Sequence, residues 1–239
     1  MTTVLPTASP APALQTRSRM GLHLTFPFSL EKTVNALAFF AASGVRDLTK
    51  LKAAKLLYLA DRHHFLNYGR PISGDRYIVM DLGPVPENTY QLTTRLIEPD
   101  EVADEAMRFA SQRLQVLEGI LRRYPVMRAR RAPDLSVFSE SEINVLEQTV
   151  REFGSKPARD LVNLSHDHRA YKRADVDRLP GSSVPLPYEF FLDDASPEQA
   201  EMLADLTAVE QENRETARAL QAAARAARAT HQTVPTTRG

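Results

Sequence analysis

Four of the six histidines occur in two close pairs, which is the spacing in this chain that comes nearest to a metal site. His63 and His64 are adjacent, and His166 and His168 flank Asp167. Adjacent side chains on a helix point roughly 100° apart, so His63 and His64 cannot easily share one ion. A site would need both pairs to converge, whereas capping and surface roles explain each pair without an ion. We therefore predict no metal and no other cofactor.

Other catalytic signatures are missing from the sequence. The chain has no cysteine, which excludes thiol catalysis, disulfides and cysteine-ligated zinc. It contains neither GxGxxG nor GxxxxGK[ST], the glycine-rich nucleotide motifs, and it lacks the GxSxG nucleophile motif. Catalysis by paired carboxylates stays open, although no pair stands out. We predict a protein that is not an enzyme.

Five arginines between positions 122 and 131 form the densest positive charge in a chain that is neutral as a whole. Residues 139–165 then follow the order helix, glycine turn, helix, which is conceivable as a DNA-binding module. A DNA-binding regulator is therefore the alternative function, although such helix pairs are common in helical domains. Otherwise the arginines are solvated or meet an acidic protein, and we assign Arg128, Arg130 and Arg131 to partner binding.

The elements that must position these residues are mostly helices. Apolar periodicity, capping residues and glycine or proline stops predict a mainly α fold with a small β element, in one compact helical domain. A capping box at Ser139 and Glu142 is the sharpest helix start. Residues 100–133 mix a helical composition with strand-like alternation. The expected elements are helices at 29–44, from Asp47 or Thr49 to about 67, at 86–97, at 139–154 and from 155 to the SHDHRAYKRA segment, a strand at 76–82 and an extended connector at 181–192.

The two ends of the chain differ from this folded part. Residues 1–22 are rich in Pro, Ala, Ser and Thr and are expected to be disordered, as is the tail at 231–239. The folded domain is expected at 23–192, followed by a C-terminal helix at 193–230. No secretory signal pattern and no apolar run of about 20 residues occurs, so we expect a cytoplasmic protein without a membrane partner.

Asp61 is the exception on an otherwise apolar helix. The helix at 49–67 is apolar around most of its circumference, which is typical of a buried central helix. Asp61 falls on its apolar face, where a carboxylate is costly unless it is paired or hydrogen-bonded. Arg76 and Tyr77 open the next strand, and we predict that Arg76 pairs with Asp61 and holds the strand and helix in register.

The stretch Gly83, Pro84, Val85 and Pro86 follows that strand directly. Both prolines fix φ and lack an N–H, so they are expected to end the strand and to form a rigid corner that leads into a helix. Val85 would then be an apolar contact for a partner, and Tyr90 an amphipathic anchor one turn further on. The other interpretation is that this corner only holds the core together.

The run KLLYLADRHHFLNYGRPISGDRYIVMDLGPVPENTY at 55–90 resembles the Panacea domain, also called the SocA-like antitoxin domain. The segment with Leu164, Ser165 and His166, and then Tyr171 before a lysine, is similar to the second half of that family. The family more often has tryptophan near the last position, and this chain has none. The resemblance covers about 30–192.

The resemblance implies a function for a sequence without a catalytic centre. It implies the antitoxin of a bacterial or phage toxin–antitoxin pair, since members of the family neutralise very different toxins by direct contact. The SocA-type member is instead a proteolytic adaptor that delivers its toxin to the ClpXP protease. We therefore expect a cognate toxin protein as partner, with the ClpX unfoldase as a second one if this chain is such an adaptor.

Overall fold

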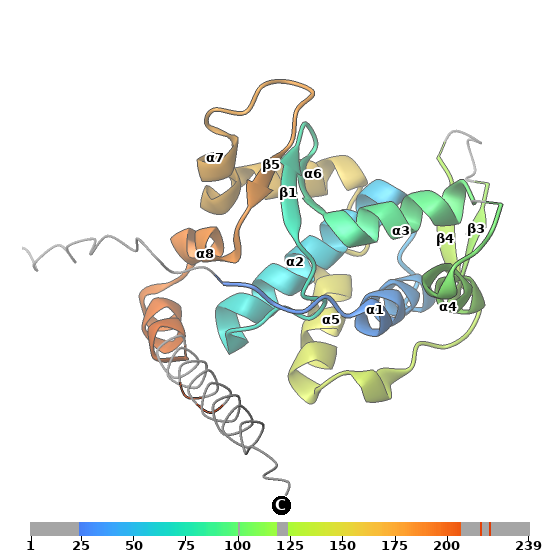
Figure 1. The fold of residues 1–239 in the computed structure, drawn as a ribbon, viewed down its shortest axis with the longest axis horizontal. Coiled ribbons are helices and arrows are strands. Elements are labelled where there is room, and N and C mark those ends of the chain that lie inside the picture. The colour runs from blue at the N-terminus through green and yellow to red at the C-terminus, as the bar shows by residue number, and fades with distance from the viewer. Residues whose placement is uncertain (1–23, 100, 119–123, 207–215, 217–219, 221–239) are drawn as a thin grey trace, which may run out of the picture.

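The computed structural model describes residues 24–99, 101–118, 124–206, 216 and 220, and arranges its helices around a central one (Figure 1). In chain order the elements are α1 (Leu30–Ala42), α2 (Lys50–Tyr68), β1 (Tyr77–Met80), β2 (Gly83–Pro86), α3 (Glu87–Ile97), α4 (Glu105–Arg113), β3 (Leu114–Leu117), β4 (Val126–Ala129), η1 (Leu135–Val137), α5 (Glu140–Phe153), α6 (Ala158–Asp167), α7 (Arg169–Asp175), β5 (Val184–Leu186), α8 (Tyr188–Phe191) and η2 (Leu192–Asp194).

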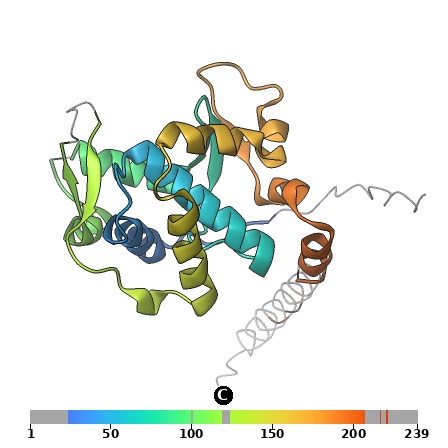
Figure 2. The same ribbon diagram turned by 180° about the vertical axis from the view of Figure 1, so that it is seen from behind.

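The helix α2 lies at the centre, as its apolar circumference predicts. Thr49 caps its first turn by accepting from the amide of Lys52, and Gly69 ends it in the left-handed conformation with φ of 74°. Leu56 and Leu57 are completely buried. The neighbours α1, α3, α5, α6 and β2 all pack against α2, and Figure 2 shows α5 and α6 on the face opposite to the one that Figure 1 presents.

The stretch from Gly83 to Pro86 is a strand and not a corner, so that prediction is wrong. It pairs antiparallel with β1, with Val85 opposite Ile78, and β5 pairs with the other side of β1. The order β2-β1-β5 makes β2 an edge strand. Proline is tolerated there because the N–H groups at alternate positions of an edge strand point away from the ladder.

The connector at 181–192 also proves to be more than extended chain. It contributes the third strand, β5, and then the short helix α8, which begins after Pro187. Tyr188 and Phe191 on α8 pack edge-on against each other, with ring centroids 5.3 Å apart, and both rings also meet Phe65 of α2. This aromatic contact fastens the end of the domain to the central helix.

The described parts of residues 100–133, the least readable part of the sequence, form one helix and two antiparallel strands. Asp104 caps α4 by accepting from the amide of Met107, and the helix runs directly into β3. The strands β3 and β4 form a separate two-stranded antiparallel sheet. Arg122 and Arg123 of the arginine cluster lie outside the described residues.

The later helices agree with their capping signals. The capping box of Ser139 and Glu142 is present at the start of α5. The segment expected as one helix from 155 is two, because His168 takes an extended ψ of 136° between α6 and α7.

The prediction of a mainly α fold with a small β element, in one compact domain, is confirmed. A helix begins at 197 and is described through 206, whereas the rest of the predicted C-terminal helix (apart from 216 and 220), the segment 1–22 and the tail 231–239 lie outside the described residues. None of the helices in the described parts combines the length and the apolar character needed to cross a bilayer.

Asp75 fixes the start of α3 from a distance. The residue at the N-cap position, Pro86, has no side chain that can cap the helix. Asp75 is completely buried and takes over this role, since its carboxylate accepts from the amides of Asn88 and Thr89 at 2.9 and 2.8 Å and from both of their side chains. A carboxylate at a helix N-terminus also interacts favourably with the helix dipole. The loop before β1 is thereby joined to the helix after β2.

We expect Asp75→Ala to lower the free energy of unfolding by about 3 kcal/mol, because it removes a cap and leaves buried donors without acceptors. The matched control is Asp104→Ala, which removes the half-exposed cap of α4 and is expected to cost about 1 kcal/mol. Urea unfolding of both variants measures the difference, and equal losses would show that Asp75 is an ordinary surface cap.

Candidate functional site

The segments that carry the family resemblance come together along α2. Lys55 and Asp61 lie on this helix, and β2 packs beside it. The loop 69–75 and the first residue of β1 reach the helix through hydrogen bonds to Asp61. Helices α6 and α7 contact the hairpin, α6 at β2 and α7 at β1. Lys55 and Asp61 are both completely buried. The hairpin is therefore the part of the fold that must satisfy these two charges.

Asp61 receives four hydrogen bonds from the chain that precedes and begins β1. Its carboxylate accepts from the amides of Ile72 and Ser73 at 2.9 and 2.8 Å, from the hydroxyl of Tyr77 at 2.8 Å, and from the Ser73 hydroxyl. Burial raises the pKa of Asp61 to about 6, and the hydrogen bonds from Ser73 and Tyr77 act in the opposite direction. The predicted need for a partner is confirmed.

The prediction that Arg76 pairs with Asp61 is wrong. Its side chain is 74% exposed and forms an ion pair with Glu87 at 3.0 Å. Side chains alternate along a strand, so when Tyr77 faces α2 its neighbour Arg76 points away. A phenol also loses less hydration on burial than a guanidinium does. Arg70, the other arginine near Asp61 in sequence, pairs with Glu142 of α5.

Lys55 binds the other end of the hairpin. Its Nζ donates to the carbonyl of Pro84 at 2.9 Å, and burial lowers the pKa of Lys55 to about 7. A side chain at Gly83 would place its Cβ 2.7 Å from this Nζ and 2.8 Å from Oγ of Ser165, and Gly83 has φ of +89°. Both the close approach and the positive φ favour glycine at this position.

His166 and Tyr171 meet in the same neighbourhood. Their rings stack with centroids 4.4 Å apart and planes 6° from parallel. The Nε2 of His166 is buried without a hydrogen-bond partner. Burial, followed by the charge of Lys55, lowers the pKa of His166, which favours the neutral ring. The resemblance to the family was the only sequence signal for this pair.

Tyr58 and His168 are a pair that the sequence did not reveal. The Tyr58 hydroxyl lies 2.9 Å from Nδ1 of His168. Burial, and then the nearby charge of Arg62, lowers the pKa of His168 to about 4, so the ring is neutral and can accept this hydrogen bond. His64 is bound elsewhere, to the Arg70 carbonyl at 2.6 Å. Within the described residues no cluster of metal-binding side chains is found.

The residues assigned to partner binding differ in burial and lie in different parts of the fold. Gly83 to Pro86 are all buried and Val85 is only 5% exposed, so the expectation of an exposed Val85 is wrong. Its position opposite Ile78 in the hairpin, under α2 and α6, accounts for this burial. Tyr90 is half-buried, with Nζ of Lys50 4.0 Å above its ring. The three assigned arginines, Arg128, Arg130 and Arg131, lie on and just after β4, away from this hairpin.

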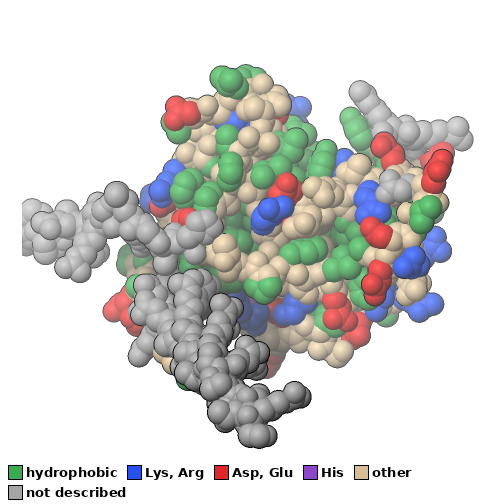
Figure 3. Space-filling view, in the orientation of Figure 1, with side chains coloured by type: hydrophobic (Ala, Val, Ile, Leu, Met, Phe, Trp, Pro, Cys, Tyr) green, Lys and Arg blue, Asp and Glu red, His purple; other side chains and the backbone are tan. Residues whose placement is uncertain are grey.

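The turn of the hairpin is exposed where its strands are not. Asp81 accepts from Arg178 at 2.7 Å and from the Gly181 amide at 3.0 Å, which ties the turn to the loop 176–183. Leu82 is 52% exposed, and Val176 and Leu179 of the adjoining loop are 77% and 72% exposed. We call Leu82, Val176 and Leu179 the tip surface. Figure 3, in the orientation of Figure 1, shows hydrophobic side chains in green at the top of the molecule, where Figure 1 draws the β1–β2 turn and the loop after α7.

The buried polar groups around α2 are better suited to hold a binding surface in place than to catalyse a reaction. The amine of Lys55 has no exposure to solvent and already donates to a backbone carbonyl. The hydroxyl of Ser165 likewise donates to the carbonyl of Val162 at 2.8 Å. Groups that are buried and already engaged hold the hairpin in place, and the hairpin in turn presents its exposed tip.

We expect Asp61→Asn to lower the free energy of unfolding by about 3 kcal/mol, because an amide group would face donors that now bind a carboxylate. Arg76→Ala should cost less than about 1 kcal/mol, as for other exposed ion pairs. Since the two side chains do not touch, the losses should add in the double variant. If denaturant unfolding instead shows a coupling free energy of about 1 kcal/mol or more between the two substitutions, Asp61 and Arg76 do interact and this prediction is contradicted.

Lys55 predicts a particular pH dependence of stability. Its pKa is about 7 in the fold and ordinarily 10.5, so between these values the unfolded chain holds one more proton than the folded chain. The free energy of unfolding of the wild type should therefore rise relative to Lys55→Met, by up to about 1.4 kcal/mol per pH unit. Urea unfolding at pH 7, 8 and 9 measures this difference. A difference that stays constant with pH would mean that Lys55 is charged in the fold.

Comparison with known proteins agrees with this arrangement. A family model described as antitoxin SocA-like, Panacea domain, matches residues 54–172. The chain matches no curated protein and no solved structure. The matched segment begins one residue before Lys55 and ends one residue after Tyr171, so it includes Asp61, the β1–β2 hairpin and His166, whereas α1 and α8 lie outside it. The chain therefore belongs, over residues 54–172, to the SocA-like antitoxin family that is defined by the Panacea domain.

Proposed function

We propose that this protein is an antitoxin that neutralises a cognate toxin protein by binding it directly, and that it does so without catalysis. The family match over residues 54–172 carries this proposal. The burial of Lys55 supports the non-catalytic part, because the most unusual amine of the site has no exposure to solvent. We further propose that the protein acts in the cytoplasm.

The tip surface, formed by the turn of the hairpin and the adjoining loop 176–183, is available to the toxin. Leu82, Val176 and Leu179 expose apolar side chains, while the ion pair of Asp81 and Arg178 holds the turn and loop together. A surface that is already ordered loses little conformational entropy on binding. Removing such apolar side chains from water at the core of an interface favours association. In this proposal the apolar contact that was predicted for Val85 is made by Leu82, which is exposed at the turn of the same hairpin.

Neutralisation can take two forms, and the finer proposal concerns the second. In simple neutralisation the bound toxin stays intact. In the adaptor form this protein also binds the ClpX unfoldase and delivers the toxin to ClpXP, which requires a second surface. The DNA-binding alternative at 139–165 gains no support from the comparisons, because the family model that matches this region is that of an antitoxin-like domain.

Co-expression with the gene product encoded beside it tests the proposed function. The neighbour should be lethal alone and harmless with the wild type. Leu82→Asp should keep its melting temperature, since Leu82 is half-exposed, and should weaken toxin binding by 1 kcal/mol or more, about the threshold for an interface anchor. Val85→Asp should unfold, because it places a charge in the core.

The matched control is Leu135→Asp, which changes an apolar side chain of similar exposure, 41%, on η1. It should protect as the wild type does. A neighbour that is harmless alone, or that stays lethal with the wild type, contradicts the antitoxin proposal. If a folded Leu82→Asp variant still protects fully, the toxin does not bind at the tip surface. The half-life of the toxin, measured with and without ClpXP, separates degradation from binding alone.

A further inference from the structure

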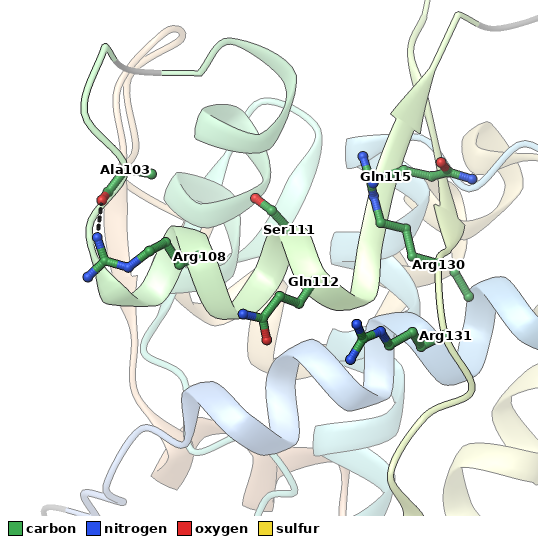
Figure 4. Close-up of a pocket in the computed structure, with 8 residues that line it drawn as sticks. Ala103, Arg108, Ser111, Gln112, Gln115, Arg130 and Arg131 are labelled. Carbon is green, nitrogen blue, oxygen red and sulfur yellow. Dashed lines mark hydrogen bonds between the residues drawn. The ribbon is translucent and has the colours of Figure 1, made fainter.

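A hollow of about 790 Å³ lies beside α4, between this helix and the β3–β4 sheet (Figure 4). Figure 1 places α4 and this sheet apart from the β1–β2 turn, so the hollow is not part of the tip surface. Its lining residues include no Asp or Glu. We call it the arginine groove, and its polar side chains are those of Arg108, Ser111, Gln112, Gln115, Arg130 and Arg131.

The three guanidinium groups of the groove are only lightly engaged. Arg108 donates to the carbonyl of Ala103 at 2.7 Å, and Arg130 donates through Nε to the carbonyl of Leu114 at 3.2 Å. Arg131 is exposed and makes no side-chain hydrogen bond or ion pair with any described residue. Because a guanidinium has five N–H donors, most of the donors in the groove remain available.

Among the described residues, no carboxylate forms an ion pair with these three arginines, although the charge of Arg108 is one of the smaller causes that lower the pKa of Asp104. Asp104, at the start of α4, is already paired with Arg95 at 2.8 Å and caps the helix. The chain as a whole is neutral, so the charges in the groove are a local excess and not part of a general basic surface. Like charges gathered in one concavity are stabilised when an anion enters it.

The shape and the donors favour carboxylates on an extended chain. Figure 4 shows Arg108 at one end of α4 and Arg131 near the other. The helix has nine residues, about 13 Å, which is the length of roughly four residues of an extended peptide. A guanidinium fork matches a planar carboxylate in two parallel hydrogen bonds, and amides and hydroxyls supply further donors.

We propose that the arginine groove is a second binding site, and that it takes an acidic, extended peptide segment of a protein partner. A nucleic acid fits the observations less well, because its phosphates call for a continuous basic face, whereas the helix beside the groove begins with two acidic residues, Asp104 and Glu105. The inference goes beyond toxin neutralisation and does not depend on the identity of the toxin.

Fluorescence anisotropy with a labelled octaglutamate peptide tests this directly on the full-length protein. The wild type should bind the peptide at low salt, and Arg131→Glu should weaken binding at least tenfold. The matched control is Arg46→Glu, which reverses the charge of another exposed arginine that makes no side-chain contact among the described residues and lies outside the groove. It should change the affinity less than twofold. Arg108→Gln provides a second variant at the opposite end of the groove and should also weaken binding.

A labelled oligothymidylate of equal charge separates the two kinds of polyanion. The proposal expects it to bind more weakly than the peptide. Tighter binding of the oligothymidylate, with the same loss in Arg131→Glu, would overturn the proposal in favour of a phosphate site. Equal weakening by Arg46→Glu and Arg131→Glu would show that no groove is involved, as would an absence of peptide binding to the wild type. Unchanged circular dichroism melting curves for all variants confirm that they are folded.

Discussion

Two ionisable side chains on one buried helix constrain the rest of this fold. Lys55 and Asp61 are both completely inside the protein, where an unsatisfied charge would cost several kcal/mol. Neither is paired with the other. Instead the chain from Ile72 to Tyr77 donates to Asp61, and the carbonyl of Pro84 accepts from Lys55. The hairpin that connects these segments is thereby docked on α2 at both ends, and its register follows from the positions of the two charges.

The position of the hairpin determines the surfaces that the protein presents. Asp75 lies between the donors of Asp61 and the strand β1, and it caps α3, so the direction of that helix follows from the same docking. The turn at Asp81 is held by Arg178, which leaves Leu82 exposed. The buried residues of the hairpin thus serve as framework, whereas Leu82 at its turn and Arg131 of the arginine groove are exposed.

Local sequence signals predicted most of the helices. The strands and the partners of buried side chains could not be predicted in the same way, because they depend on contacts between residues that are distant in sequence. The caps at Ser29, Thr49 and Ser139 all mark helix starts that the structure contains, because a cap is satisfied within four residues. The strands β2 and β5 escaped prediction because both contain proline and each has only three or four residues. The buried position of Asp61 was readable from helical periodicity, but its partners were not, since backbone amides and a tyrosine hydroxyl carry no charge pattern. The burial of Val85 depended on the pairing of β1 with β2, which no local pattern specifies.

Native-state hydrogen exchange tests most directly whether the buried charges of α2 hold the hairpin. The amides of Ile72 and Ser73 donate to Asp61, and that of Thr89 donates to Asp75. If the hairpin is docked as described, these amides exchange only when the whole domain unfolds, with the same free energy as amides in the middle of α2. Exchange of these amides through a smaller opening, with a free energy well below that of α2, would show that the hairpin detaches independently and would contradict the central role of Lys55 and Asp61.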